Sequence, residues 1–180
     1  MGVSRLMMKE KFRYPSLETE RMHLEILTLS DAEEVFQHFS DEHVTKFMDI
    51  EPCKDVEEAK EIIQFHLDDS GCRWGLFDKN NNALMGTGGF HCWDKSKAEI
   101  GFDLAKSYWG KGYMTEAILA MVQFGFNEMK LDCIEATVEP GNLKSIKLMQ
   151  RLGFEQAKEL KENLIYFTLK NNEAQKRETF

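Results

Sequence analysis

The feature that most constrains the fold is a short glycine turn, Gly110-Lys111-Gly112, placed between two segments of different periodicity. Before it, residues 98–104 alternate between two sets of side chains, as a β-strand does. After it, apolar residues recur at helical spacing over residues 113–125. We therefore expect a strand that leads into a helix through a turn whose backbone conformation suits glycine.

Apolar runs and alternating patterns predict the other strands. An asparagine-rich turn at residues 79–82 joins two of them into a hairpin. Gly86-Thr87-Gly88-Gly89 lies inside the second strand of this hairpin, and glycines there indicate a bulge or the close approach of another backbone. The predicted strands cover residues 22–26, 74–77, 83–90, 98–104, 133–138 and 164–169.

Capping patterns predict where the helices start. Ser30 with Glu33, and Asp55 with Glu58, have the spacing of a capping box. Asn142 is a suitable N-cap for a short later helix. The order of elements is strand, helix, helix, mostly antiparallel strands, then strand–helix–strand–helix–strand. This order predicts an α+β (mixed α/β) fold with one central sheet.

Length and charge limit the function classes. The 180 residues suit one domain, which we expect to cover residues 1–170, followed by a polar tail at residues 171–180. The chain has 23 lysine and arginine residues against 31 aspartate and glutamate residues, so its net charge is −8. This charge argues against a nucleic-acid binder and mildly favours a cationic partner.

Targeting and metal-binding signals are missing from the sequence. No apolar run approaches the roughly 20 residues that span a bilayer, and residues 1–14 lack the apolar core of a signal peptide. We therefore expect a cytoplasmic protein with no membrane partner. The cysteines and histidines lack CxxC, HxxxH and HExxH spacings, so we expect neither a disulfide framework nor a bound metal.

The glycine turn also carries the sharpest chemical signal. A helix N-terminus presents unpaired N–H groups and a partial positive charge, which bind phosphate. Lys111 adds a cation, and Thr115 adds a hydroxyl in the first helical turn. These residues predict a pyrophosphate cradle, although a turn that merely caps the helix explains them equally well. The GxxxxGK[ST] and GxGxxG motifs are absent, which excludes a P-loop and a dinucleotide fingerprint.

Four stretches, in this order, together resemble the GNAT superfamily of acetyl-CoA-dependent N-acetyltransferases. The first resembles the RimJ/RimL-like branch, whose founding members acetylate the N-termini of ribosomal proteins. The stretches are residues 17–24 (LETERMHL), 99–104 (EIGFDL), 109–117 (WGKGYMTEA), and 142–145 (NLKS) with 152–154 (LGF).

This resemblance implies a central, mostly antiparallel mixed sheet with helices on both faces, splayed between the strands at residues 98–104 and 133–138. The pantetheine arm of acetyl-CoA would lie in the gap, and the diphosphate would lie on N–H groups of the glycine turn. The residues implied to bind the coenzyme are Phe102, Asp103, Leu104, Trp109, Gly110, Lys111, Gly112, Tyr113, Met114, Thr115, Asn142 and Ser145.

The resemblance also implies the catalytic roles. Glu99 matches a glutamate that acts as general base in some relatives, with Glu139 and Asp103 as competing carboxylates. Ser145 matches the serine of an N-x-x-S pattern whose hydroxyl lies near the coenzyme A sulfur, where it would protonate the departing thiolate. The implied reaction is direct acetyl transfer from acetyl-CoA to a primary amine, with no metal.

The acceptor and the function class stay open at this point. Peptide N-termini such as those of ribosomal proteins, polyamines and small-molecule amines all fit the resemblance. A catalytically silent acyl-CoA-binding sensor is a second class. A mononucleotide-binding protein that uses residues 110–112 is a third. The branch is often dimeric, so the resemblance also implies a homodimer.

Overall fold

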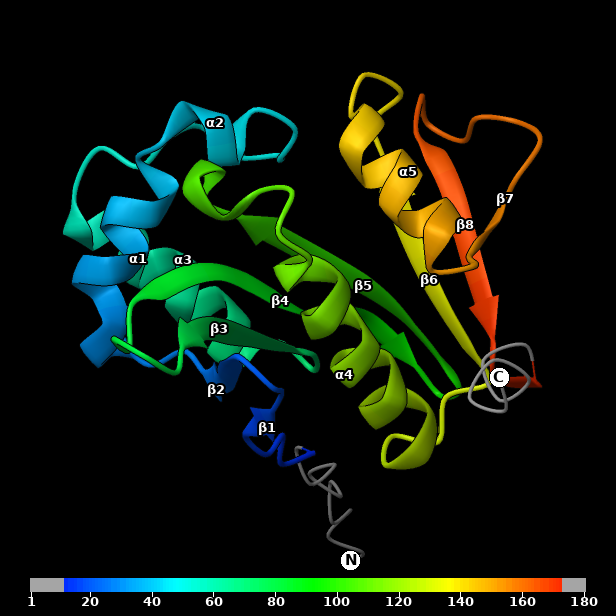
Figure 1. The fold of residues 1–180 in the computed structure, drawn as a ribbon, viewed down its shortest axis with the longest axis horizontal. Coiled ribbons are helices and arrows are strands. Elements are labelled where there is room, and N and C mark those ends of the chain that lie inside the picture. The colour runs from blue at the N-terminus through cyan, green and yellow to red at the C-terminus, as the bar shows by residue number, and fades with distance from the viewer. Residues whose placement is uncertain (1–11, 173–180) are drawn as a thin grey trace, which may run out of the picture.

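The computed structural model describes residues 12–172, and their centre is one eight-stranded sheet in the order β1-β2-β3-β4-β5-β6-β8-β7 (Figure 1). Neighbouring strands are antiparallel except β5 and β6, which are parallel. Of the predicted polar tail, residues 173–180 lie outside the described part. The strands are β1 (Leu17–Glu18), β2 (Met22–Ile26), β3 (Cys72–Asp78), β4 (Leu84–Asp94), β5 (Lys97–Leu104), β6 (Cys133–Val138), β7 (Glu155–Gln156) and β8 (Ile165–Lys170).

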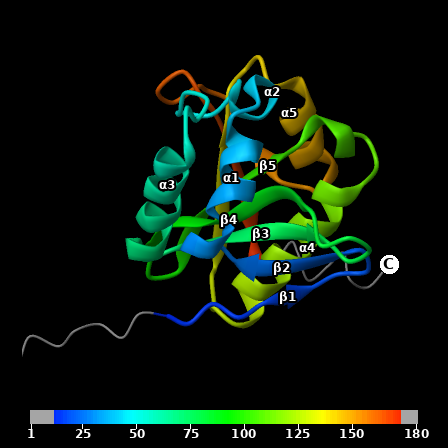
Figure 2. The same ribbon diagram turned by 90° about the vertical axis from the view of Figure 1, so that its left-hand side faces the viewer.

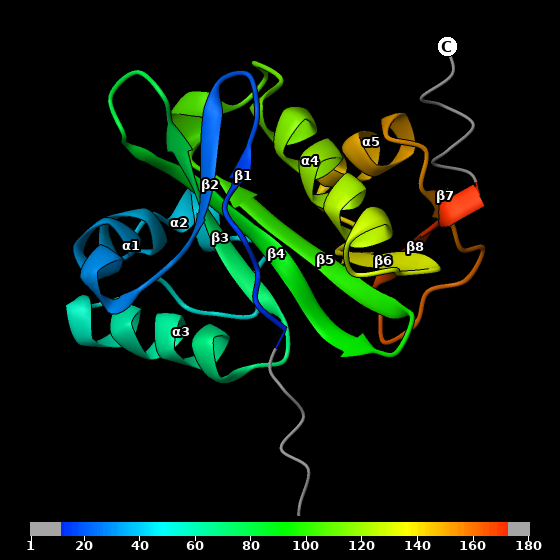
Figure 3. The ribbon, with the colours of Figure 1, turned by 90° about the horizontal axis from the view of Figure 1, so that it is seen from below.

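Helices cover both faces of the sheet, which confirms the predicted α+β class. On one face lie α1 and α3, which face the viewer in Figure 2, and α4 lies on the opposite face (Figure 3). Every helix in the described part is too short or too polar to span a bilayer. The helices are α1 (Ala32–Phe39), α2 (Glu42–Thr45), α3 (Val56–Asp68), α4 (Tyr113–Asn127) and α5 (Leu143–Arg151), with 3₁₀ turns η1 (Leu29–Asp31) and η2 (Lys106–Tyr108).

The sheet is splayed between β5 and β6, as predicted. The two strands pair only at their first residues, and the last pair in the register is Glu99 with Glu135. Beyond that point β5 continues along β4 to Leu104, whereas β6 continues along β8 to Val138. The second halves of β5 and β6 therefore diverge (Figure 1), and the backbone of β5 has no strand partner on that side.

The glycines of β4 and β5 lie where neighbouring groups approach closely. The backbone approach predicted in β4 is confirmed at Gly89, where a Cβ atom would clash with the carbonyl oxygen of Cys72 on β3. A Cβ atom at Gly88 would lie 2.8 Å from the Cε of Met121 on α4, too close for a side chain to be added without a shift. A Cβ atom at Gly101 would lie 2.5 Å from the Nε2 of His91 and 3.1 Å from the Nη1 of Arg73. These glycines let polar side chains and a helix lie directly on the sheet.

Of the two helix starts predicted from capping boxes, one is confirmed and one is wrong. Asp55 caps α3, because its carboxylate accepts a hydrogen bond of 3.0 Å from the N–H of Glu58. Ser30 is not the cap of α1, because it lies inside η1. The capping box there is formed by Thr28 and Asp31, since the N–H of Thr28 donates to the carboxylate of Asp31 at 2.8 Å.

The carboxylate of Asp103 on β5 is a buried charged group in the sheet. Its Oδ1 accepts hydrogen bonds from the Nε2 of His38 on α1 (2.5 Å) and from the N–H of Thr87 on β4 (3.0 Å). Its Oδ2 accepts from the Nη2 of Arg73 on β3 (2.5 Å) and from the hydroxyl of Thr87 (2.6 Å). All four side chains are buried, so this network joins one helix to three strands through a single carboxylate.

These contacts make Asp103 a permanent anion at neutral pH. Burial alone would raise the pKa of its carboxyl, but the hydrogen bond and charge of His38 and the charge of Arg73 lower it to about 2. Since an ionised carboxylate only accepts hydrogen bonds, the Nε2 of His38 must carry the proton that it shares with Asp103. The network is fully hydrogen-bonded, as a buried charge requires.

We expect Asp103→Ala to destabilise the fold by about 3–5 kcal/mol, because it leaves the Arg73 guanidinium buried without its carboxylate. Urea denaturation measures this change in the free energy of unfolding. Glu135→Ala is the control, since its ion pair with Lys97 is 3.6 Å long and its side chain is 32% exposed. Such a pair contributes no more than about 1 kcal/mol. Equal losses in the two variants would contradict this role of Asp103.

Two further histidines, His66 and His91, predict that the protein loses stability in mild acid. Burial, with the charge of Arg73 adding to it, lowers the pKa values of His66 and His91 to about 4. In the unfolded chain their pKa is about 6.5, so the unfolded state takes up these protons first. This part of the stability is present above pH 6.5 and is lost as the pH falls toward 4.

Urea midpoints measured between pH 7 and 4 check this expectation. The double variant His66→Gln, His91→Gln should lose less stability over this window than the parent protein. A slope as steep as that of the parent protein would show that other groups cause the acid sensitivity.

Candidate active site

A cavity of about 1240 Å³ lies at the end of β5, on the side of the sheet where β5 and β6 have separated. Four segments line it: α2 with the residues that follow it, the end of β5 with η2, the start of α4, and the first turns of α5. The cavity is large enough for an extended organic ligand rather than a single ion.

The structure brings most of the predicted site residues together around this cavity. Those that line it are Phe102, Asp103, Leu104, Trp109, Gly110, Gly112, Tyr113, Met114, Thr115, Asn142 and Ser145. Of the predicted coenzyme-binding set, only Lys111 is not part of the lining. Its ammonium group donates instead to the carbonyl oxygen of Ser107 in η2, at 2.9 Å.

The glycine turn leaves the start of α4 open. Gly110 and Gly112 have φ angles of +72° and +83°, in the left-handed region that favours glycine. Gly112 is the N-cap of α4, and no side chain caps the helix there. The first N–H groups of α4 therefore remain available for an anionic ligand at the cavity.

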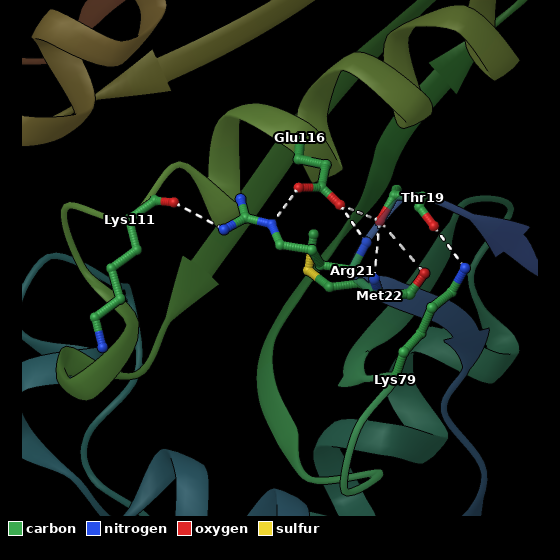
Figure 4. Close-up of polar contacts among 6 residues, drawn as sticks. All are labelled: Thr19, Arg21, Met22, Lys79, Lys111 and Glu116. Carbon is green, nitrogen blue, oxygen red and sulfur yellow. Dashed lines mark hydrogen bonds and ion pairs between the residues drawn. The ribbon is translucent and has the colours of Figure 1, made fainter.

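The start of α4 is held by a distant segment, the turn between β1 and β2 (Figure 4). The Oε1 of Glu116 accepts from the hydroxyl of Thr19 (2.6 Å) and from the N–H of Arg21 (2.8 Å). Its Oε2 accepts from the Nε of Arg21 (2.7 Å), whose Nη1 donates to the carbonyl oxygen of Lys111 (3.0 Å). The predicted motif at residues 17–24 thus supports the glycine turn of the motif at residues 109–117.

Two carboxylates line the cavity, and both are already engaged. Asp103 is held by its four hydrogen bonds, so it is not a proton acceptor near neutral pH. Burial alone would raise the pKa of Glu116, but its hydrogen bonds to Thr19 and Arg21 lower it. Neither group is free to take a proton from a substrate.

The basic residues of the cavity were not predicted. Three of them, Lys144, Lys147 and Arg151, lie on α5 with i, i+3, i+7 spacing, so the sequence pattern could have placed them on one helix face. The Nη2 of Arg151 donates to the hydroxyl of Thr115 on α4 (2.9 Å). The ammonium of Lys144 lies 3.7 Å from the centre of the Trp109 ring. Both contacts cross the cavity from α5 to the α4 side.

Ser145 and Asn142 lie at the start of α5, as predicted. Asn142 is the N-cap, and its Oδ1 accepts a hydrogen bond of 3.2 Å from the N–H of Ser145. The Ser145 hydroxyl makes no hydrogen bond to another group in residues 12–172, and the residue lines the cavity. This hydroxyl is therefore available to a ligand.

The structure places Glu99 at the point where β5 and β6 separate, outside the cavity lining. Its Oε1 accepts a hydrogen bond of 2.7 Å from the hydroxyl of Thr137 on β6. The competing carboxylate of Glu139 is exposed and also lies outside the lining. Within residues 12–172, no three His, Cys, Asp or Glu side chains gather as a metal site requires.

We expect Glu116→Ala to weaken coenzyme A binding roughly tenfold, or about 1.4 kcal/mol, because it frees Arg21 and loosens the glycine turn. Calorimetric titration measures the dissociation constant. Glu57→Ala removes an exposed ion pair with Lys60 on α3 and is the control. Unchanged affinity in Glu116→Ala would contradict a role of this contact in holding the turn.

Comparison with known proteins assigns the family. A family model described as "Acetyltransferase (GNAT) domain" matches residues 21–155. The protein named "Uncharacterized N-acetyltransferase p20" from Bacillus licheniformis is 40% identical over 147 residues, which cover 78% of this chain and 83% of that protein. The [Ribosomal protein uS5]-alanine N-acetyltransferase of Escherichia coli is 30% identical over 112 residues, which cover 58% of this chain and 55% of that enzyme.

Among solved structures, an acetyltransferase of the GNAT family from Bacillus anthracis superposes with a TM-score of 0.77 at 24% identity. The superposition covers 88% of this chain and 99% of that chain, so the two share a fold. The family model and the relative from Bacillus licheniformis each span about three quarters of the sequence. The chain therefore belongs to the GNAT family of acetyltransferases.

Proposed function

We propose that the protein transfers an acetyl group from acetyl-CoA directly to a primary α-amine, such as the N-terminus of a ribosomal protein or another peptide. The observation that carries this proposal is the cavity at the splay, which combines an uncapped helix N-terminus, basic side chains and the free hydroxyl of Ser145. An extended ligand with phosphates at one end and a reactive thioester at the other suits this combination.

The coenzyme would be held mainly by backbone groups. Its diphosphate would accept hydrogen bonds from the N–H groups between Trp109 and Met114, where both glycines have positive φ angles. Its pantetheine arm would pair with backbone groups of residues 102–104, since β5 has no strand partner there on the β6 side. A backbone N–H of this strand would polarise the thioester carbonyl.

The chemical step needs a neutral amine. The amine nitrogen attacks the thioester carbon, a C–N bond forms, and the C–S bond breaks. Before the attack, the ammonium group of the acceptor loses one proton to solvent, and after the attack the nitrogen loses a second proton. Ser145 donates its hydroxyl proton to the departing thiolate and takes a proton back from solvent. Glu99, at the point where the strands separate, would accept the amine proton through water.

The lack of a free carboxylate in the described cavity lining favours an α-amine as the acceptor. At pH 7, neutralising a lysine-type amine costs about 4.6 kcal/mol, whereas an α-amine costs only about 1–1.4 kcal/mol. Because Asp103 and Glu116 are engaged, the described lining offers no free carboxylate as a strong base. The similarity to the enzyme named as an alanine N-acetyltransferase of ribosomal protein uS5 also supports this acceptor class.

Thiol release from acetyl-CoA tests the proposal. We expect turnover with short peptides that have a free N-terminus, and little with polyamines or aminoglycosides. Turnover on polyamines alone would overturn the α-amine proposal. Tight coenzyme A binding without turnover on any amine would favour an acyl-CoA sensor, and no binding would contradict the coenzyme site.

The same assay separates the catalytic roles. Ser145→Ala should lower kcat by roughly 10²-fold, because the thiolate then leaves without a proton donor, and Glu99→Gln should lower it as well. Lys130→Gln, a change outside the cavity lining, is the control. Full turnover in both Ser145→Ala and Glu99→Gln, with acetyl-CoA binding intact, would show that the roles are wrongly assigned.

A further inference from the structure

The cavity gathers cations that have no carboxylate partner. Five basic side chains line it, and none of them forms an ion pair with a carboxylate within residues 12–172. The five are Lys46, Lys106, Lys144, Lys147 and Arg151.

These cations form two groups on opposite sides of the splay. Lys144, Lys147 and Arg151 belong to α5, which lies across the splay from α2 and η2 (Figure 1). Two of the three already reach the α4 side, at Trp109 and Thr115. This α5 group therefore suits the phosphates of the coenzyme, which would lie at the start of α4.

The second group consists of Lys46, in the segment after α2, and Lys106, in η2; both residues are exposed and line the same cavity. The ammonium of Lys106 lies 3.2 Å from the Nε2 of His43, whose Nδ1 lies 3.0 Å from the carboxylate of Asp41. An ammonium group only donates, so His43 accepts from Lys106 as a neutral ring. The ammonium of Lys46 lies 5.1 Å from the centre of the Phe47 ring. Neither ammonium group forms a direct ion pair with a carboxylate in residues 12–172, and the carboxylate of Asp41 reaches Lys106 only through the His43 ring.

We infer that Lys46 and Lys106 form an anion subsite for the acceptor, which is an α-amine whose own molecule carries a carboxylate near the amine. An acidic amino acid and a peptide with an acidic residue after its N-terminus share this chemistry. A polyamine would meet two unpaired cations and no free carboxylate of the described lining, so it would be repelled. This inference rests on the proposed function.

The net charge of −8 favours a cationic partner only when it is averaged over the whole chain. At the cavity the local sign is reversed, because Asp103 and Glu116 are already bound to Arg73, His38 and Arg21. Local charge at the site, rather than the total, decides which acceptor is attracted.

Acceptors that differ only in charge test this inference. The tripeptide amides Ala-Glu-Ala, Ala-Gln-Ala and Ala-Lys-Ala keep the same N-terminus. We expect kcat/KM to fall in that order, with at least a tenfold difference between the first and the last. Free L-glutamate in the same assay distinguishes an amino-acid acceptor from a peptide acceptor, and spermidine should be the poorest substrate.

Substitutions of Lys46 and Lys106 test whether these two lysines cause the charge preference for the acceptor. In the double variant Lys46→Gln, Lys106→Gln, the ratio of kcat/KM for Ala-Glu-Ala to kcat/KM for Ala-Lys-Ala (the Glu/Lys ratio) should fall close to one. The change should come mainly from KM of the acceptor. KM for acetyl-CoA should stay within about twofold of the parent value. Lys46→Glu, Lys106→Glu should reverse the ratio. Lys97→Gln, which removes a cation that pairs with Glu135 outside the cavity lining, should leave the ratio unchanged.

The outcomes separate this inference from the proposed function. Turnover without a charge preference, a preference for the lysine peptide, or a higher KM for acetyl-CoA in the Lys46/Lys106 double variant would overturn the inference alone. Coenzyme A binding without turnover on any amine would overturn the proposed function, and the inference with it.

Discussion

Four hydrogen bonds converge on the buried carboxylate of Asp103, and the position of β5 beside the cavity depends on them. Beyond Glu99, β5 has lost the support of β6, so β4 and this network hold it in place. The network joins α1, β3 and β4 to the strand residue between Phe102 and Leu104. A buried charge with all its hydrogen bonds satisfied stiffens its surroundings, whereas a half-satisfied one would destabilise them. The open half of β5 can therefore present its backbone to a ligand without a neighbouring strand.

Structural demands also set the electrostatics of the site. Asp103 and Glu116 are the carboxylates of the described lining, and each one holds part of the scaffold: Asp103 holds β5, and Glu116 holds the glycine turn through Arg21. Because both are neutralised by arginine, the lysines and the arginine on the other walls dominate the local field. A chain with a net negative charge thus has a basic cavity. Because the described lining has no free carboxylate to act as a base, the expected acceptors are amines that lose a proton easily.

Local sequence patterns predicted the helices and strands, but they could not predict contacts between residues that are far apart in the sequence. The strand at residues 133–138 matches β6, the strand at 98–104 is β5 without its first residue, and Asn142 caps α5 as expected. The burial of Asp103 could not be read from alternation, because it depends on His38, 65 residues away, and on Arg73. The contact between Thr19 and Glu116 spans 97 residues. The four-residue α2, which helps to line the cavity, is too short to show a period.

A crystal structure of the chain with coenzyme A would test the central claim most directly. We expect the diphosphate on the backbone N–H groups between Trp109 and Met114, and the pantetheine arm along residues 102–104 of β5. The Ser145 hydroxyl should lie within hydrogen-bond distance of the sulfur, and Arg151 or Lys144 should have exchanged its contact with Thr115 or Trp109 for a phosphate. A coenzyme bound outside the splay, or with its phosphates away from the glycine turn, would contradict the account.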